Sequence, residues 1–202
     1  FPSLFDALCH IFERYFGDGP WVASKNLLLA ALAQGIVYDA EALMLEPRNL
    51  DVRLSLMWQT NLAFGGTLSV LQGGDWAVHT LASMIEPFTN EPHGTVLSVV
   101  FREWLTLVHA RRPLLVESLL EGIFRSGTFS RNIAKFDELL RRWNMPRKII
   151  VIRHPECVDI ITRKSSSINA SGTIGNYSRL DADDTRKLLS KIIVPKETDV
   201  EY

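Results

Sequence analysis

Apolar side chains recur every three to four positions along most of this chain, which is the period of an α-helix. Proline, glycine and capping residues divide the pattern into segments. Helices are predicted from Ser3 to Phe16, from Trp21 to Leu45, from Asn49 or Asp51 past Gly65–Gly66, over 75–86, from Pro92 to Ala110, from Pro113, from Ser130 or Asn132 to a point before Pro146, and from Asp181 or Asp183 to Ile193. The pattern therefore predicts an all-α, multi-helix bundle.

Two segments depart from the helical period. Residues 148–152 (KIIVI) have the composition of a short strand, although extended coil fits them equally well. Residues 163–179 are rich in serine, glycine and asparagine and are predicted to form a mobile loop. The tail after Ile193 is expected to fray. No strand–turn–helix unit with a glycine-rich phosphate loop is recognisable, so the sequence itself offers no nucleotide-binding motif.

Composition narrows the possible partners. The chain has 202 residues and a net charge of −1, which gives no reason to expect nucleic acid or an anionic membrane as a partner. Its length suits one domain over residues 1–202. No segment is expected to span a bilayer or to act as a signal peptide. Two distant cysteines, Cys9 and Cys157, do not suggest disulfides, so the cytoplasm is the expected compartment.

The candidate chemistry lies in one carboxylate and three of the five histidines: Asp6, His10, His79 and His93. Asp6 and His10 are four residues apart on a predicted helix and therefore share one face. Imidazole and carboxylate ligands together suit a divalent transition metal. Residues 1–100 hold all four and carry 4 basic against 10 acidic side chains. This negative charge would favour cation binding, but solvated helix faces would produce the same excess.

Each of these residues also has an ordinary structural interpretation. An Asp–His pair at helical spacing is commonly a surface hydrogen bond, and a histidine in an apolar helix, such as His79, is commonly a satisfied core residue. Glu13 continues the stripe of Asp6 and His10 and could lie behind them, but a solvated carboxylate is expected. Spacing alone therefore leaves open whether the candidate ligands converge.

Glycines before His79 also have two interpretations. Gly73–Gly74 ends one helix and Asp75 is expected to cap the next, which needs no function. A Gly-Gly turn also lets a flat ligand approach the backbone closely. The two remaining histidines, His109 and His154, lie at a helix end and in a loop, where no function is indicated.

Several runs of sequence resemble a known family. They are FDALCHIFERYF (5–16), LSLMWQTNLAF (54–64), GGDWAVHTL (73–81), EPHGTVLSVVFREWL (91–105), KFDELLRRWNMP (135–146) and IGNYSRLDADDTRKLL (174–189). They look like the C-terminal helical domain of iron-containing (group III) alcohol dehydrogenases, especially the butanol dehydrogenase-like branch, whose fold is shared with dehydroquinate synthase-like proteins. The resemblance covers most of the chain and is strongest over residues 5–105.

The resemblance implies a function and a set of ligands. Asp6, His10, His79 and His93 stand where the family binds its metal, Fe²⁺ or Zn²⁺. It implies an NAD- or NADP-dependent alcohol dehydrogenase or aldehyde reductase acting on a small alcohol or aldehyde, and a homodimer or higher oligomer at full length. Gly73 and Gly74 would lie near the cofactor. Trp76 and Phe88 are weaker candidates for the pocket wall.

Two departures from the family pattern qualify this expectation. A proton-relay histidine often follows the third ligand by four residues, and this chain has Ser83 there. A hydroxyl passes a proton but cannot hold the charge as imidazole does. The family's N-terminal nucleotide-binding domain, which makes most dinucleotide contacts, is not part of the sequence, so the chain by itself is expected to bind metal without turning over.

Two other functions stay open from the residues. One is a degenerate, non-catalytic helical module that keeps the fold and the metal, an interpretation that Ser83 favours. The other is a helical metallohydrolase, which would need an adjacent His-Asp pair that the sequence lacks.

Overall fold

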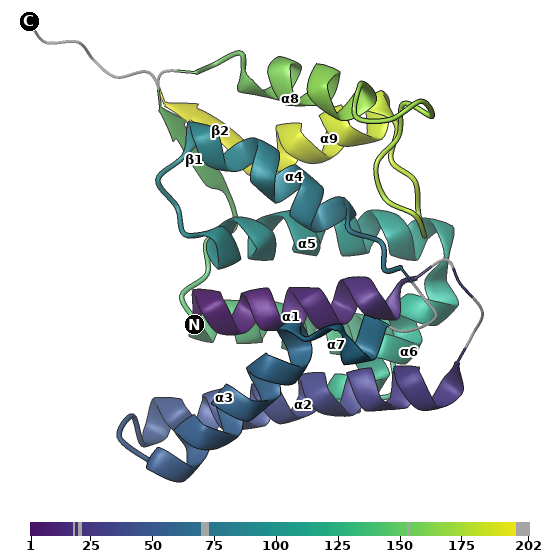
Figure 1. Ribbon diagram of the computed structural model, residues 1–202. Coiled ribbons are helices and arrows are strands. Elements are labelled where there is room, and N and C mark those ends of the chain that lie inside the picture. The colour runs from purple at the N-terminus through teal and green to yellow at the C-terminus, as the bar shows by residue number, and fades with distance from the viewer. Residues whose placement is uncertain (18, 20–21, 70–72, 153, 197–202) are drawn as a thin grey trace, which may run out of the picture.

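The computed structural model describes residues 1–17, 19, 22–69, 73–152 and 154–196. Within those residues the chain forms nine α-helices and two short strands (Figure 1). The helices are α1 (Pro2–Tyr15), α2 (Ala23–Leu45), α3 (Leu50–Phe64), α4 (Ala77–Ile85), α5 (His93–Arg111), α6 (Pro113–Phe124), α7 (Phe129–Arg142), α8 (Cys157–Ser166) and α9 (Ala182–Ile192). Short 3₁₀ turns follow α3 at Gly66–Ser69 and α4 at Glu86–Phe88. The prediction of an all-α bundle is confirmed.

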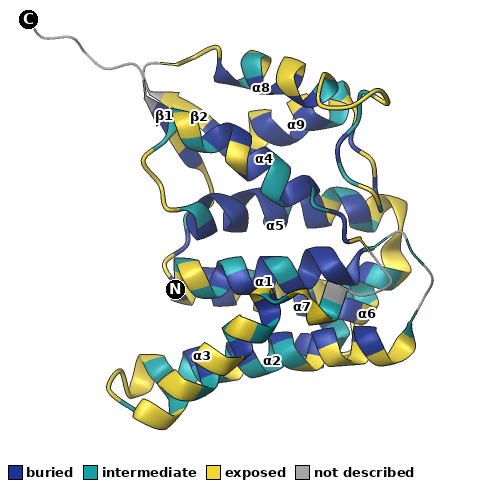
Figure 2. Cartoon of the chain, viewed as in Figure 1, coloured by how far each residue is buried: buried dark blue, intermediate teal, exposed yellow. Residues whose placement is uncertain are grey.

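The helices stack in layers, with α8 and α9 at one end and α2 and α3 at the other (Figure 1). Helix α1 lies in the middle of the stack and packs on α5, α2 and α3, while α4 lies beside α5. Figure 2 shows that α1 and α5 are mostly buried, whereas much of α2 and α3 is exposed. The middle layers therefore hold the core, and the candidate ligands come from helices in those layers.

Aromatic packing joins α1, α5 and α7 at the centre. Phe12 stacks on Phe101 with ring centroids 4.7 Å apart, and Phe5 meets Phe101 and Phe136 edge-on or tilted. All of these rings are essentially inaccessible to solvent. Burying one such ring stabilises the fold by about 1.5–3 kcal/mol relative to leaving it exposed. This cluster fixes α1 against α5 and so fixes the distance between the first and last candidate ligands.

The two strands form a small parallel sheet. β1 (Ile149–Ile152) pairs with β2 (Ile193–Lys196), with Ile149 opposite Ile193. The predicted strand at 148–152 is thus confirmed. The expectation of a frayed tail after Ile193 is wrong for residues 194–196, which belong to β2; the rest of the tail lies outside the described residues.

Helix ends differ from the prediction in several places. The side chains of Asn49, Thr128 and Asp181 accept hydrogen bonds at the starts of α3, α7 and α9. Of the expected alternatives, the structure thus selects Asn49 over Asp51 and Asp181 over Asp183, whereas α7 begins earlier than the expected Ser130 or Asn132. Ser3 is not a cap, because α1 begins at Pro2. Helix α8 was not predicted, because its end falls within the serine-rich run at 163–167 that suggested a loop.

The expectation that no segment is long and apolar enough to span a bilayer is wrong for α2. By length and composition alone it could cross a membrane, since it contains an 18-residue window with at most two charged residues. In the bundle this helix packs against α1, α3 and α6. Only 28% of that window is buried, so α2 presents an exposed apolar surface.

Candidate metal centre

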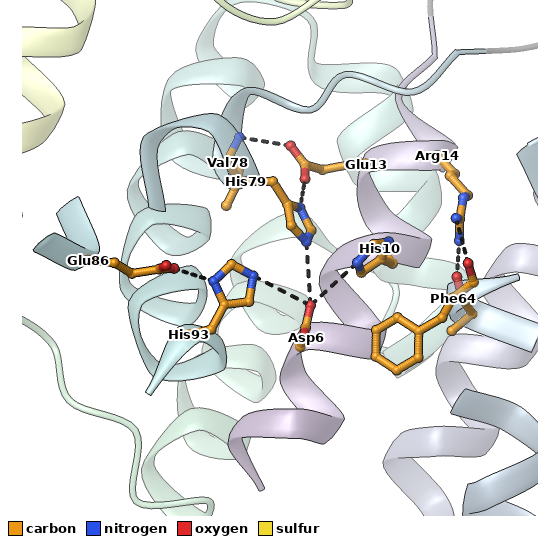
Figure 3. A network of polar contacts seen from close by, with 10 residues as sticks. Asp6, His10, Glu13, Arg14, Phe64, Val78, His79, Glu86 and His93 are labelled. Carbon is orange, nitrogen blue, oxygen red and sulfur yellow. Dashed lines mark hydrogen bonds and ion pairs between the residues drawn. The ribbon is translucent and has the colours of Figure 1, made fainter. Parts of the chain in front are cut away.

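Three histidines from three helices converge on one carboxylate (Figure 3). The Nε2 atoms of His79, His10 and His93 lie 3.4, 3.6 and 3.9 Å from Oδ1 of Asp6. The imidazole rings of His10 and His79 are 4.4 Å apart, and those of His79 and His93 are 5.5 Å apart. The four candidate ligands therefore lie close together, around Oδ1 of Asp6. The ligand atoms of Asp6, His79 and His93 lie within 4.8 Å of one another, and His10 joins this group through its distance to Asp6.

Local structure explains each position. Asp6 and His10 lie one turn apart on α1, His79 lies in the first turn of α4, and His93 is the first residue of α5. The turn at Glu86–Phe88 brings the chain back so that His93 returns to the side of α1 that carries Asp6. The sequence pattern predicts that Pro92 lies in the first turn of this helix. In the structure Pro92 is instead the N-cap, immediately before α5.

Close helix packing is required at this point. A Cβ added to Gly94 would overlap the carbonyl oxygen and carbonyl carbon of Pro2. Only glycine lets α5 approach α1 this closely. The residue after His93 thus sets the separation between His93 and Asp6.

The site is partly shielded from solvent. The side chain of His79 is 16% exposed, those of His10 and Asp6 are 22% and 23% exposed, and that of His93 is 37% exposed. Phe64 and Trp76 meet the His10 ring edge-on at 5.0 and 5.5 Å. His10 therefore has two aromatic neighbours, and His93 is the most exposed of the four candidate ligands.

Charges at the site depend on these surroundings. Burial lowers the pKa of His10 to about 4, and the neighbouring His79 adds to that effect, so His10 is neutral at pH 7. Burial alone would lower the pKa of His79, but hydrogen bonds with Asp6 and Glu13 raise it to about 9. Burial alone would raise the pKa of Asp6, but its hydrogen bond with His79 and the charges of the histidines lower it.

The donor set fits a divalent transition metal. One carboxylate oxygen and three imidazole nitrogens are the ligands that Fe²⁺ and Zn²⁺ accept in proteins. The Nδ1 atom of His10 is buried and has no hydrogen-bond partner among the described residues. The His10 ring is therefore held in its orientation, with Nε2 toward Asp6, by packing rather than by a hydrogen bond. A metal ligand needs such a fixed orientation.

Glu13 occupies a different environment from the solvated one expected. Its side chain is fully buried, and its carboxylate contacts Nδ1 of His79 and accepts the Val78 N–H at 2.8 Å. The Glu13 carbonyl also accepts the Asp75 N–H at 2.8 Å. The expectation of a solvated carboxylate is wrong because α4 covers this part of α1.

Asp75 performs a role that the sequence did not predict. The N-cap of α4 is Trp76, in the left-handed region at φ 62°, although Asp75 does accept the Ala77 N–H at 3.1 Å. The other carboxylate oxygen accepts N–H groups at 2.7–3.2 Å from Asn176, Tyr177 and Ser178. Asp75 thus fastens the loop before α9 to the start of α4. Burial, with the charge of Glu13, raises its pKa to about 6 despite these bonds.

The two glycines before Asp75 differ. Gly74 is buried at φ +70°, its carbonyl accepts the Asn176 amide, and a Cβ would crowd Trp76 and the Glu13 carbonyl. These close contacts would by themselves require glycine at position 74. Gly73 is exposed, with nothing within 4 Å of an added Cβ, and its carbonyl accepts the indole N–H of Trp76 at 2.6 Å.

The remaining candidates lie outside the cluster. Ser83 is exposed on α4, one turn beyond His79. His109 stacks on Phe129 and contacts Glu117 at 2.9 Å. The His154 ring lies 5.3 Å from the Phe88 ring. His109 and His154 thus each pack on an aromatic ring, and neither contacts Asp6.

Comparison with known proteins agrees with this architecture. The model of the Fe-containing alcohol dehydrogenase family, C-terminal part, matches residues 2–193. The chain therefore belongs to the Fe-containing alcohol dehydrogenase family and corresponds to its C-terminal helical domain. The resemblance inferred from the sequence runs is confirmed.

Individual relatives are distant but match most of the chain. A probable NADH-dependent butanol dehydrogenase 1 of Bacillus subtilis is 24% identical over 196 residues, which span 93% of this chain and 50% of the relative. The crystal structure of NADH-dependent butanol dehydrogenase A from Thermotoga maritima superposes with a TM-score of 0.79 at 24% identity, over 95% of this chain and 51% of that one. The aldehyde reductase YqhD of Escherichia coli gives 0.78 at 18% identity, over 94% and 51%. The chain thus spans about half the length of the relatives that it matches.

Proposed function

We propose that this chain is the metal-binding half of an NAD(P)-dependent alcohol dehydrogenase or aldehyde reductase. Asp6, His10, His79 and His93 would hold one Fe²⁺ or Zn²⁺. The observation that carries the proposal is the approach of three Nε2 atoms from three helices to one oxygen of Asp6, all within 3.9 Å. When bound, the ion would polarise the substrate oxygen and so favour hydride transfer between the carbinol carbon and the nicotinamide.

The chain's own residues would prepare the site for the ion and the substrate. His10 is already neutral and can donate its lone pair directly. His79 carries a proton that the ion must displace, and Asp6 keeps its negative charge because its pKa is lowered. Phe64 and Trp76 would exclude water from the side of the site away from His93.

The nicotinamide cofactor, NAD or NADP, would be held mainly by a nucleotide-binding half that precedes this domain in the complete protein. Gly73 is the better candidate for a cofactor contact, since its surface is open, whereas Gly74 is committed to packing. Ser83 would occupy the relay position and pass a proton through its hydroxyl. Residues 1–202 would form one domain of a cytoplasmic, oligomeric enzyme. The names of the relatives suggest small alcohols or aldehydes as its substrates.

The experiment is an assay of the complete polypeptide, with both halves, after loading with Fe²⁺ or Zn²⁺. We expect oxidation of NADH or NADPH in the presence of straight-chain aldehydes from acetaldehyde to hexanal. The variant H79A should lose this activity, and H154A, which alters an exposed histidine away from the cluster, should keep it. A metal-loaded protein without activity on any of these aldehydes would contradict the proposal.

A degenerate, non-catalytic metal-binding module is the second candidate. It is favoured by one feature, the exposed Ser83 at the expected relay position. Metal binding together with inactivity in the same assay would support it. A metallohydrolase is disfavoured, because the chain has no adjacent His-Asp pair.

A further inference from the structure

Two glutamates outside the ligand set contact the far nitrogen atoms of two of the histidines. Glu13 contacts Nδ1 of His79, and Glu86 contacts Nδ1 of His93 (Figure 3). In both cases the opposite nitrogen, Nε2, faces Asp6. His10 has no such partner, since its Nδ1 is buried and unpaired among the described residues. The three histidines are therefore oriented by two different means.

Glu13 is fixed more firmly than a surface carboxylate would be. It lies on the same face of α1 as Asp6, seven residues later, which is about two helical turns. Its second carboxylate oxygen accepts the Val78 N–H, one of the N–H groups at the start of α4 that have no partner within the helix. One buried side chain thus holds both the start of α4 and the ring of His79.

Glu86 acts from the other end of α4. It follows the last residue of that helix, and its side chain is 34% exposed. It spans the turn that connects α4 to α5 and meets the first residue of α5. Unlike that of Glu13, its side chain has one described polar contact, so truncation of the side chain should disturb little else.

A carboxylate on Nδ1 has a defined effect on a ligand histidine. A neutral imidazole carries one N–H, and a carboxylate that accepts it keeps that proton on Nδ1. The Nε2 lone pair is then free for the metal, the ring is held in orientation, and the ligand becomes more basic. Loss of such a partner typically weakens metal affinity about 10–100-fold.

We propose that Glu13 and Glu86 are positioning residues of the metal centre, which hold His79 and His93 with Nε2 toward Asp6 before the ion arrives. This inference rests on the proposed function, since it presupposes an ion at the cluster.

The test measures Co²⁺ binding by the full chain, using calorimetry for affinity and visible absorption for coordination. E86A removes the acceptor, whereas E86Q keeps a carbonyl oxygen that can accept the same Nδ1–H. We expect E86A to bind Co²⁺ about 10–100-fold more weakly with an altered absorption band, and E86Q to recover most of the affinity. E13Q should weaken binding by a similar factor, because the two carboxylate oxygens of Glu13 contact different N–H groups, and glutamine replaces one of these oxygens with an NH2 group that cannot accept a hydrogen bond.

The control is E91Q, which removes a negative charge from an exposed glutamate in the same turn, two residues before His93. It should bind as the unaltered chain does. Thermal unfolding without metal separates positioning from folding, and if E13Q fails to fold, the Glu86 variants decide the matter. Equal affinity and spectra for E86A, E91Q and the unaltered chain would overturn the inference. Absence of Co²⁺ binding by the unaltered chain would instead overturn the proposed function.

Discussion

His79 is the residue on which the site depends most. It is the most buried of the three histidines, and it hydrogen-bonds two carboxylates, those of Asp6 and Glu13. With a pKa of about 9, it is protonated at pH 7 and donates both N–H groups. An arriving ion would replace the proton on Nε2, while Glu13 would retain the one on Nδ1. The metal-free chain thus has a proton where the loaded chain would have the ion.

This exchange predicts a pH dependence of stability. The pKa of His79 rises from 6.5 to about 9 on folding, so its stabilising effect is complete below pH 6.5 and disappears as the pH rises through about 9. We therefore expect the free energy of unfolding of the metal-free chain to fall between these values. Urea unfolding at a series of pH values measures it, and H79Q should remove much of the slope. A slope of the opposite sign in the unaltered chain would show that His79 is not held by its carboxylates.

At this scale the sequence predicted the candidate ligands but not the residues that contact them from behind. Asp6 and His10 follow from helical spacing, and His79 and His93 follow from the resemblance to a family. Glu13 looked solvated because the sequence does not reveal that α4 covers it. Glu86 gave no signal, since its contact with His93 depends on how the turn after α4 is folded.

Among the elements, α4 is the helix whose position matters most for the site, because it carries His79. It is only nine residues long, and its start is tied to α1 through Glu13 and to the loop before α9 through Asp75. Isolated helices of this length are marginal in water, so these contacts and burial supply its stability. The position of His79 is therefore a tertiary property rather than a local one.

The crossing of α1 and α5 provides a direct test at the scale of elements. Gly94→Ala places a methyl group where the Pro2 backbone lies, so the two helices must move apart. We expect a loss of about 1–3 kcal/mol in the free energy of unfolding, as in other overpacked cores, and weaker metal binding because His93 moves away from Asp6.

Chemical denaturation and metal titration measure these two effects. The matched control is Gly127→Ala, where an added Cβ meets nothing within 4 Å but the backbone lies at φ +81°. That variant should lose stability through backbone strain while retaining metal affinity. Unchanged metal affinity in Gly94→Ala would contradict the role given to this crossing.

Helix type and order were largely predictable, and the errors have physical causes. The segments that form α1 to α7 and α9 were identified because each is a run rich in apolar residues bounded by proline, glycine or a capping residue, although in α2 and α3 the apolar side chains lie on exposed as well as buried sides. Helix α8 was missed because serines in its last turn resemble a loop. β2 was missed because Ile192, Ile193 and Val194 continue the apolar pattern of α9, and only pairing with β1 makes them a strand.

For the whole molecule, the most distinctive feature is the exposed apolar surface of α2 and α3 (Figure 2). It includes Leu27, Leu28, Tyr38, Leu45, Leu50, Leu54, Met57 and Trp58, each more than half exposed. No charged residue occurs between Asn26 and Tyr38 or between Leu54 and Gly74. Monomeric proteins rarely expose large apolar patches, so this number of exposed apolar side chains on two helices raises the question of what covers them.

Two leucines of α2 test whether this surface is exposed in solution. Leu45 is 84% exposed and Leu29 is fully buried. If the chain is a monomer, Leu45→Gln should change the free energy of unfolding by less than about 0.5 kcal/mol, whereas Leu29→Ala should lower it by about 2–5 kcal/mol. Thermal denaturation at several protein concentrations measures both. A large, concentration-dependent loss in Leu45→Gln would show instead that an assembly covers this surface.

The central claim is that four side chains from three helices hold one metal ion. The measurement that tests it most directly is the metal content of the purified chain after equilibration with Fe²⁺ or Zn²⁺, for the unaltered chain, H79A and H154A. The account predicts about one ion per chain in the unaltered protein and in H154A, and little or none in H79A. Equal metal content in H79A and the unaltered chain would contradict it.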